Sequence, residues 1–431
     1  MLQTLRNAFK VPELRKKILF TVFILILYRF GAVIPVPYVS SDVLGMLMSQ
    51  GDGSIFQYLN ILSGDAFSKA TLFALSISPY ITSSIVMQLL TIAIPALEKL
   101  SKNGEEGKKK INQITRYVTV ALGLITAYGY YMYMRTNGAL TDKSVFAAIV
   151  IIACYSAGSA LIMWLAEKIN ENGIGNGISM ILFVNIVSAG PQIVMALYSL
   201  CVDKTWRSWG IVFAELIVIV TLILVVFVIF VTNSERRIPI QYAKRMVGRK
   251  QYGGQSSGLP LKLNMTGVMP IIFANSIVAL PSTIALLFPT PAEGTFWYNF
   301  QQLFSYTSWV YAIVFFVLII AFAYFYVSIS FNPIEVANNL KKNGGAVPGI
   351  RPGKPTADYI TKVLGRVTLI GALFLDIVAV LPLIVNIVSG TALGSIAFGG
   401  SSLLIVVGVA LETFRELESQ MTMRHYKGFL E

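Results

Sequence analysis

Ten long apolar stretches restrict the folds open to this sequence. Each is close to the length of about 20 residues that a helix needs to cross a bilayer. Charged residues make up 13% of the chain, whereas soluble domains carry about 25%. The sequence therefore predicts an all-α polytopic membrane protein. The expected spans cover roughly residues 18–37, 71–95, 114–135, 144–165, 174–198, 209–232, 265–288, 309–331, 366–389 and 399–419.

Positive charges indicate how these spans are oriented. With the N-terminus placed in the cytoplasm, 27 Lys and Arg residues fall on the cytoplasmic side and 5 on the opposite side. Cytoplasmic loops carry the excess of Lys and Arg, so we expect both termini to be cytoplasmic. The basic, amphipathic segment 1–17 precedes the first stretch without a small-residue cleavage site, so we expect that stretch to be retained.

Ten spans divide evenly into an N-terminal half, residues 1–205, and a C-terminal half, residues 206–431. Because each half holds five spans, the second half runs inverted relative to the first. Inverted halves usually place a site at the bilayer midplane between them. This expectation rests on topology, because the halves share no convincing residue-level repeat.

The second stretch is unusually polar for a span. Residues 72–90 carry six polar side chains and Pro79, groups that neighbouring helices or water can satisfy and lipid cannot. A segment too short and too polar to span, 56–70, precedes it. This combination is typical of a pore or transport site, and the alternative is a helix buried in a bundle. Residues 264–281 have the same polar, proline-bearing character, so we expect the second and seventh helices to face each other.

Two long cytoplasmic loops, 233–262 and 331–366, hold 13 of the 27 cytoplasmic positive charges. A topology signal combined with attraction to anionic lipid explains the number of charges. It does not explain the interleaved Gly, Pro, Tyr and Gln, or the strand-like alternation of residues 238–245. Long ordered loops more often dock a partner, either RNA backbone or an acidic protein surface.

The inventory for catalysis is poor. Cys154 and Cys201 are the only cysteines and His425 is the only histidine, which argues against a disulfide framework and multi-histidine metal sites. The sequence contains no nucleophile elbow, zinc-protease motif or phosphate-binding loop. We therefore expect no enzymatic activity, cofactor or metal. Asp376, midway along the ninth stretch, would serve a proton or ion transporter, and the alternative is a buried carboxylate bonded to neighbouring hydroxyls.

Seven motifs occur in a fixed order along essentially the whole chain. Together they resemble the SecY family, the channel subunits of the Sec protein-translocation complex. The resemblance implies a clamshell of two five-helix halves around a central pore in the plasma membrane. The motifs are YRFGAVIPVPYV (28–39), LNILSGDAFSKATLFALSISPYITSSIVMQLL (59–90), GIGNGIS (173–179), IPIQYAKR (238–245), LPLKLNMTGVMPIIFA (259–274), VPGIRPG (347–353) and GGSSLLIVV (399–407).

The resemblance also implies roles for particular residues. Segment 59–70, here called the plug segment, matches a short helix that blocks the outer funnel, and its core is Asn60, Ile61, Leu62, Ser63, Gly64, Asp65, Ala66 and Phe67. The apolar pore ring would comprise Ile77, Ile81, Ile178, Leu182, Met269, Ile272 and Ile405. The lateral gate would include Thr82, Gln88, Asn275 and Leu280.

The two cytoplasmic loops match the surface that docks the motor ATPase SecA and the ribosome. The implied docking residues are Arg236, Arg237, Lys244, Arg245, Arg249, Lys250, Arg351 and Lys354. Other implied partners are SecE, SecG, signal sequences, nascent chains and membrane lipid. A hydrophobic constriction would exclude ions by dewetting and make no specific bonds to a passing chain. Transport through it would need no covalent chemistry, because SecA or the ribosome supplies the driving force.

Two other functions remain open on the sequence alone. A secondary transporter for a small solute would use Asp376 and the inverted halves, but it needs polar groups that converge on a substrate. A membrane scaffold or receptor would conduct nothing. The apolar character of the matched ring favours a protein-conducting channel over both.

Overall fold

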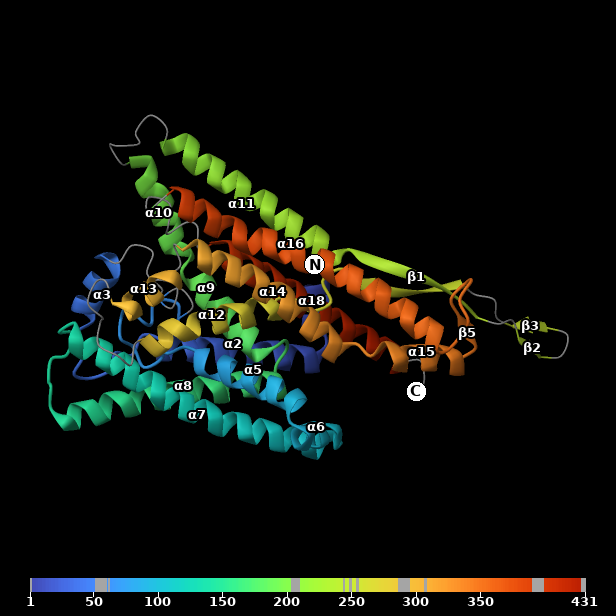
Figure 1. Cartoon of the computed structure of the whole chain (residues 1–431), viewed down its shortest axis with the longest axis horizontal. Coiled ribbons are helices and arrows are strands. Elements are labelled where there is room, and N and C mark those ends of the chain that lie inside the picture. The colour runs from blue at the N-terminus through green and yellow to red at the C-terminus, as the bar shows by residue number, and fades with distance from the viewer. Residues whose placement is uncertain are drawn as a thin grey trace.

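Long helices lying side by side form most of the molecule, and a small sheet protrudes at one end (Figure 1). The structure is a computed structural model. It describes residues 2–50, 60, 63–202, 210–242, 245–247, 250–252, 256–285, 295–305, 308–389 and 399–427.

Local sequence signals explain many helix starts in the first half. Proline occupies one of the first two positions of the helices that begin at Pro12 (α2), Ser78 (α5) and Pro95 (α6). Its missing N–H and fixed φ suit a helix start. The Ser144 side chain caps the helix that begins at Val145 (α8) by accepting a hydrogen bond from the Ala147 N–H. The helices are α1 (Leu2–Lys10), α2 (Pro12–Gly31), α3 (Ser41–Gln50), α5 (Ser78–Ala93), α6 (Pro95–Lys102), α7 (Gly104–Thr136), α8 (Val145–Asn172), α9 (Gly177–Ser188) and α10 (Gly190–Val202).

The second half alternates helices with the protruding strands. Ser308 and Asn332 cap two of its helices with their side chains. The helices are α11 (Gly210–Asn233), α12 (Met269–Ala285), α13 (Phe296–Leu303), α14 (Trp309–Ser330), α15 (Pro333–Lys342), α16 (Lys354–Ser389) and α18 (Gly399–Lys427). The strands are β1 (Glu235–Tyr242), β2 (Arg245–Val247), β3 (Lys250–Tyr252), β4 (Ser256–Lys262) and β5 (Gly345–Ala346).

Each expected span overlaps a helix, but two of them, the second and the fifth, differ from a simple span. Residues 72–77 form turns, so α5 begins only at Ser78. The chain bends by 101° between α5 and α6, because Ile94 precedes a proline and is extended. The fifth stretch is divided into α9 and α10. Among the described residues, four helices are long and apolar enough to cross a membrane, or five if the bent pair is one span.

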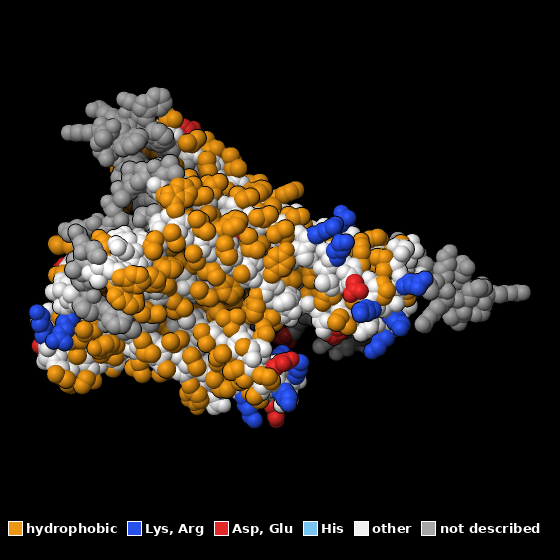
Figure 2. Space-filling view, viewed as in Figure 1, with side chains coloured by type: hydrophobic (Ala, Val, Ile, Leu, Met, Phe, Trp, Pro, Cys, Tyr) orange, Lys and Arg blue, Asp and Glu red, His pale blue; other side chains and the backbone are white. Residues whose placement is uncertain are grey.

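Hydrophobic side chains cover most of the visible face of the helical body (Figure 2). Exposed apolar residues are especially frequent on α11, where Leu222, Val226 and Phe230 are each at least 60% exposed. Such a face is expected where lipid replaces water as the solvent. Lys and Arg lie mainly on the protruding end and at the margins of the body (Figure 2).

The protruding sheet has the strand order β4-β1-β5, and both pairings are antiparallel. In β1, Ile238 and Ile240 are buried while Arg236 and Arg237 are exposed. The strand prediction for residues 238–245 is therefore confirmed as far as Tyr242, where β1 ends.

Candidate functional site

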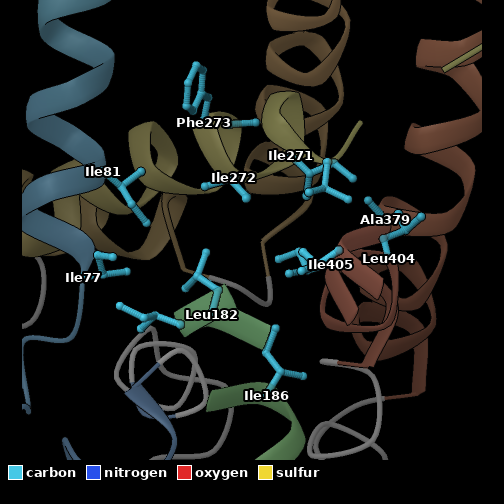
Figure 3. Close-up of a cluster of buried hydrophobic side chains, with 14 of the residues drawn as sticks. Ile77, Ile81, Leu182, Ile186, Ile271, Ile272, Phe273, Ala379, Leu404 and Ile405 are labelled. Carbon is cyan, nitrogen blue, oxygen red and sulfur yellow. The ribbon is translucent and has the colours of Figure 1, made fainter. Parts of the chain in front are cut away.

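Apolar side chains from four helices converge inside the helical body. Ile77 precedes α5 and Ile81 lies in it, while Leu182, Ile272 and Ile405 come from α9, α12 and α18. All five are at most 4% exposed and belong to one hydrophobic cluster. Figure 3 shows them around a common centre. The structure thus brings together five of the seven expected ring residues.

The other two expected ring residues, Ile178 and Met269, are half-buried and pack against the same cluster. They lie in the first turns of α9 and α12. The seven residues therefore share one apolar region, with two of them at its edge. Aliphatic side chains offer a passing chain no hydrogen bonds, so the region could seal without binding.

A narrow cleft adjoins this ring between α5, α7 and α12. Thr82, Asn275 and Leu280, three of the four expected gate residues, line it together with Ile81 and Ile272. The cleft has a volume of about 80 Å³, which is room for a few waters. A helix with its side chains is about 10–12 Å across, so α5 and α12 would have to separate before a helical segment could enter.

Most hydroxyls along the cleft bond to their own helices. Thr126 donates to Leu122, Ser276 to Ile272 and Thr283 to Ala279, all through backbone carbonyls. These bonds leave the hydroxyl groups satisfied whether the cleft is closed or open. Gln88, the fourth expected gate residue, is not among the lining residues, and its amide donates to Ser84 Oγ within α5.

The described part of the plug segment is held by several hydrogen bonds of its own. The Asn60 amide donates to Asp65 Oδ1 at 3.0 Å, and its Oδ1 accepts from the Ser68 N–H at 2.9 Å. Ser63, Gly64, Asp65, Ala66 and Phe67 are buried. The resemblance predicts a short helix here; Asn60 and Ser63 are helical, and residues 64–70 form turns. Ile61 and Leu62 lie outside the described residues.

Aromatic side chains hold the far end of this segment. The Tyr130 hydroxyl of α7 donates to the Phe67 carbonyl at 2.6 Å. The two rings lie 4.4 Å apart, and Tyr155 of α8 packs edge-on against Tyr130. The plug segment is therefore anchored to the first half of the chain.

The two expected docking loops form one body. Ile238 and Leu261 of the sheet share a hydrophobic cluster with Val347, Ile360 and Leu364 of the second loop and α16. On the surface of this body, Arg236, Arg237, Arg351 and Lys354 are exposed. Arg245 and Lys250 belong to the paired strands β2 and β3, and Lys244 and Arg249 lie outside the described residues.

Asp376 lies in α16 with 1% of its surface exposed. Neither of its carboxylate oxygens has a hydrogen-bond partner among the described residues, which differs from the expected bonding to hydroxyls. The described residues contain no group of three or more His, Cys, Asp and Glu placed to hold a metal ion. Within the described part of the chain, no hydrogen-bonding groups converge on the Asp376 carboxylate as a solute site would require.

A polar cluster beside the plug segment was not predicted from the sequence. Asn185 of α9 is fully buried and donates to Ser76 Oγ at 3.3 Å, and the Tyr28 hydroxyl of α2 lies close to both. Arg29 Nη1 donates to the Gly64 carbonyl at 3.5 Å. Arg29 within an expected span and Asn185 within an apolar stretch were the available signals.

Comparison with known proteins settles the family. The SecY family model matches residues 71–414. The chain belongs to the SecY family. It is 43% identical to the protein translocase subunit SecY of Streptomyces galbus and 42% identical to that of Mycobacterium tuberculosis strain H37Rv, in each case over the full length of both chains. The resemblance carried by the seven motifs is therefore confirmed.

Solved SecY and Sec61 channels share the fold. A structure described as that of a protein-conducting channel aligns over 96% of both chains with a TM-score of 0.64 and 17% identity. Sec61 in a canine ribosome–channel complex aligns over the same share with a TM-score of 0.60 and 16% identity. The mostly helical, multi-pass membrane fold expected of the SecY family is confirmed. Family membership also confirms that the chain is not an enzyme, because its relatives are named as translocase subunits.

Proposed function

We propose that the chain forms the protein-conducting channel of a Sec translocase. In this proposal, unfolded preproteins cross the plasma membrane through it, and hydrophobic segments leave sideways into lipid. Membership of the SecY family carries the translocase function. The convergence of Ile77, Ile81, Leu182, Ile272 and Ile405 from four helices is the observation that supports a sealed pore.

The architecture completing the proposal has ten spans in two inverted halves, 1–205 and 206–431, arranged as a clamshell with both termini in the cytoplasm. The overlap of every expected span with a helix supports it. The seven ring residues form the constriction and the plug segment closes it from outside. Thr82, Asn275 and Leu280 line the seam through which a signal sequence reaches lipid, and Gln88 continues this seam toward the cytoplasm.

The protruding body formed by loops 233–262 and 331–366 is proposed as the docking surface for SecA and for the ribosome. Its exposed Arg236, Arg237, Arg351 and Lys354 support a site for acidic protein or RNA backbone. Lys244, Arg245, Arg249 and Lys250 belong to the same proposed surface. SecE and SecG are the proposed stable partners, and copurification of the tagged chain from its own membranes would test for both and for SecA.

The central experiment compares the intact chain with a variant lacking residues 60–69, both reconstituted with their copurified partners. The intact complex should translocate a precursor when SecA and ATP are supplied and should pass little ion current at rest. The deletion should raise the resting current. An unchanged current in the correctly inserted deletion variant would favour a scaffold without a conducting pore.

A solute transporter remains the second candidate because Asp376 is buried without a partner among the described residues. The Asp376→Asn variant separates the two functions. Protein export should persist in this variant, because no step of the proposed pathway uses the carboxylate. Loss of solute uptake with normal export would favour the transporter.

A further inference from the structure

Beside the pore ring, three polar residues surround the turn of the plug segment at Gly64. We infer that Arg29 of α2, with Asn185 and Ser188 of α9, forms a polar socket that holds the plug segment closed. This inference rests on the proposed function of segment 59–70 as a plug. It attributes part of the stability of the closed channel, relative to the open one, to named contacts outside the apolar ring.

The fit around Gly64 is the first observation. A Cβ atom built on Gly64 would lie 2.8 Å from Arg29 Nη1, 2.8 Å from Ser188 Oγ and 3.2 Å from Asn185 Cα. The socket therefore touches the plug backbone itself and leaves no room for a side chain. Arg29 Nη1 also donates to the Gly64 carbonyl at 3.5 Å. The contact therefore combines a directional hydrogen bond with close packing.

The socket is braced by its own bonds. Ser188 Oγ donates to the Asn185 carbonyl at 2.7 Å. The Asn185 amide donates to Ser76 Oγ, which lies directly before the ring residue Ile77. Asn185 thus meets the plug turn through its Cα and Ser76 through its side-chain amide, so the two closing elements are held by one helix.

Three residues that are not glycine, in the plug segment and shortly after it, have an unfavourable backbone conformation. Asp65, Ala70 and Ser76 have φ of 68°, 48° and 51°, the left-handed region that side chains rarely occupy. Residues persist in such conformations only where surrounding contacts enforce them. The closed arrangement therefore depends on contacts that oppose relaxation, and the Arg29 bond to Gly64 is one that an opening channel would break.

Arginine suits this position for a physical reason. Arg29 lies in the last turn of α2, which is the end farther from the cytoplasmic basic residues. This position is inside the expected membrane region. A charged side chain there is expensive unless it finds polar partners. The Gly64 carbonyl supplies one only while the plug is in place, so the charge itself favours the closed state.

The test measures resting ion current through the full chain, purified with its partners and placed in planar bilayers. Arg29→Gln should raise the resting current about fivefold, because a charge-assisted bond of modest strength is lost from the closed state alone. Arg29→Lys keeps a donor and should give a smaller rise. Arg135→Gln, which removes an exposed charge at the far end of α7, should give none.

A second pair of variants tests the fit without removing a charge. Gly64 and Gly138 both have positive φ, 63° and 71°, but a Cβ on Gly138 would meet nothing within 4 Å. Alanine strains the backbone at both positions and crowds the socket only at Gly64. Gly64→Ala should therefore raise the resting current and Gly138→Ala should leave it unchanged. This pair carries the test if Arg29→Gln does not insert.

The variant lacking residues 60–69 separates the two ways of failing. If the deletion raises the current while Arg29→Gln and Gly64→Ala match the intact chain, the socket is refuted and the plug stands. If the deletion also leaves the current unchanged, the proposed plug and the socket both fail. The socket is supported if the resting current rises in Arg29→Gln and Gly64→Ala but not in the controls Arg135→Gln and Gly138→Ala.

Discussion

Replacing Leu182 by asparagine tests whether the apolar ring is the seal. Leu182 is 2% exposed and faces Ile272 and Ile405 (Figure 3). Full burial of a leucine side chain contributes about 1.5–3 kcal/mol, and most of this is lost on substitution. An amide left unpaired in its place adds a penalty of about 1–3 kcal/mol. Opening the ring would admit water to the amide, so both effects disfavour the closed state.

The two effects together amount to at least about 2.5 kcal/mol. At about 1.4 kcal/mol for each factor of ten, this changes the ratio of open to closed channels about 60-fold. The assay is the resting ion current of the reconstituted complex, paired with export of a precursor whose signal sequence is weakened. Both should rise in Leu182→Asn.

Leu182→Met is the matched control, because a swap that conserves volume and apolarity costs less than about 1.5 kcal/mol. Its resting current should stay close to that of the intact chain. A Leu182→Asn complex that inserts normally, retains its partners and passes no more current than Leu182→Met would refute the seal.

Three further variants address the seam and the protruding body. Thr82→Cys with Leu280→Cys should crosslink across the cleft and block translocation, and failure to crosslink in any state would remove the gate assignment. Arg351→Glu should impair SecA-dependent export with normal membrane insertion, whereas normal export would contradict docking there. Leu261→Ala should destabilise the sheet by about 2–5 kcal/mol, because Leu261 is fully buried; limited proteolysis should cut the protruding body faster, and unchanged cleavage would argue against the shared core.

The positions of the helices could be predicted because apolar length is a local property. Every expected span overlaps a helix, and the alternation of residues 238–245 correctly predicted a strand. The turns at 72–77 could not be predicted in this way. Their residues are as apolar as those of α5, but Ser76 adopts a left-handed conformation and bonds to Asn185, which is 109 residues away. A tertiary contact thus overrides local propensity.

The grouping of the site residues depended on family motifs rather than on periodicity. A spacing of four residues can place Ile77 and Ile81 on one helix face, but spacing cannot bring Leu182, Ile272 and Ile405 to the same centre. The shared core of the two cytoplasmic loops was similarly hidden, because β1 and β5 are more than 100 residues apart and pair through only a few positions. Partners that distant in sequence leave no periodic trace.

The division between an apolar ring and a polar socket has a functional consequence. A ring that must pass every sequence gains from making no specific bonds, since each polar group in it would bind some chains and delay them. A seal without specific bonds also has little to define one closed geometry. The Arg29 contact to Gly64 and the Asn185 contact to Ser76 lie beside the ring rather than in it. Directional bonds there can define the closed state and leave the path of the chain apolar.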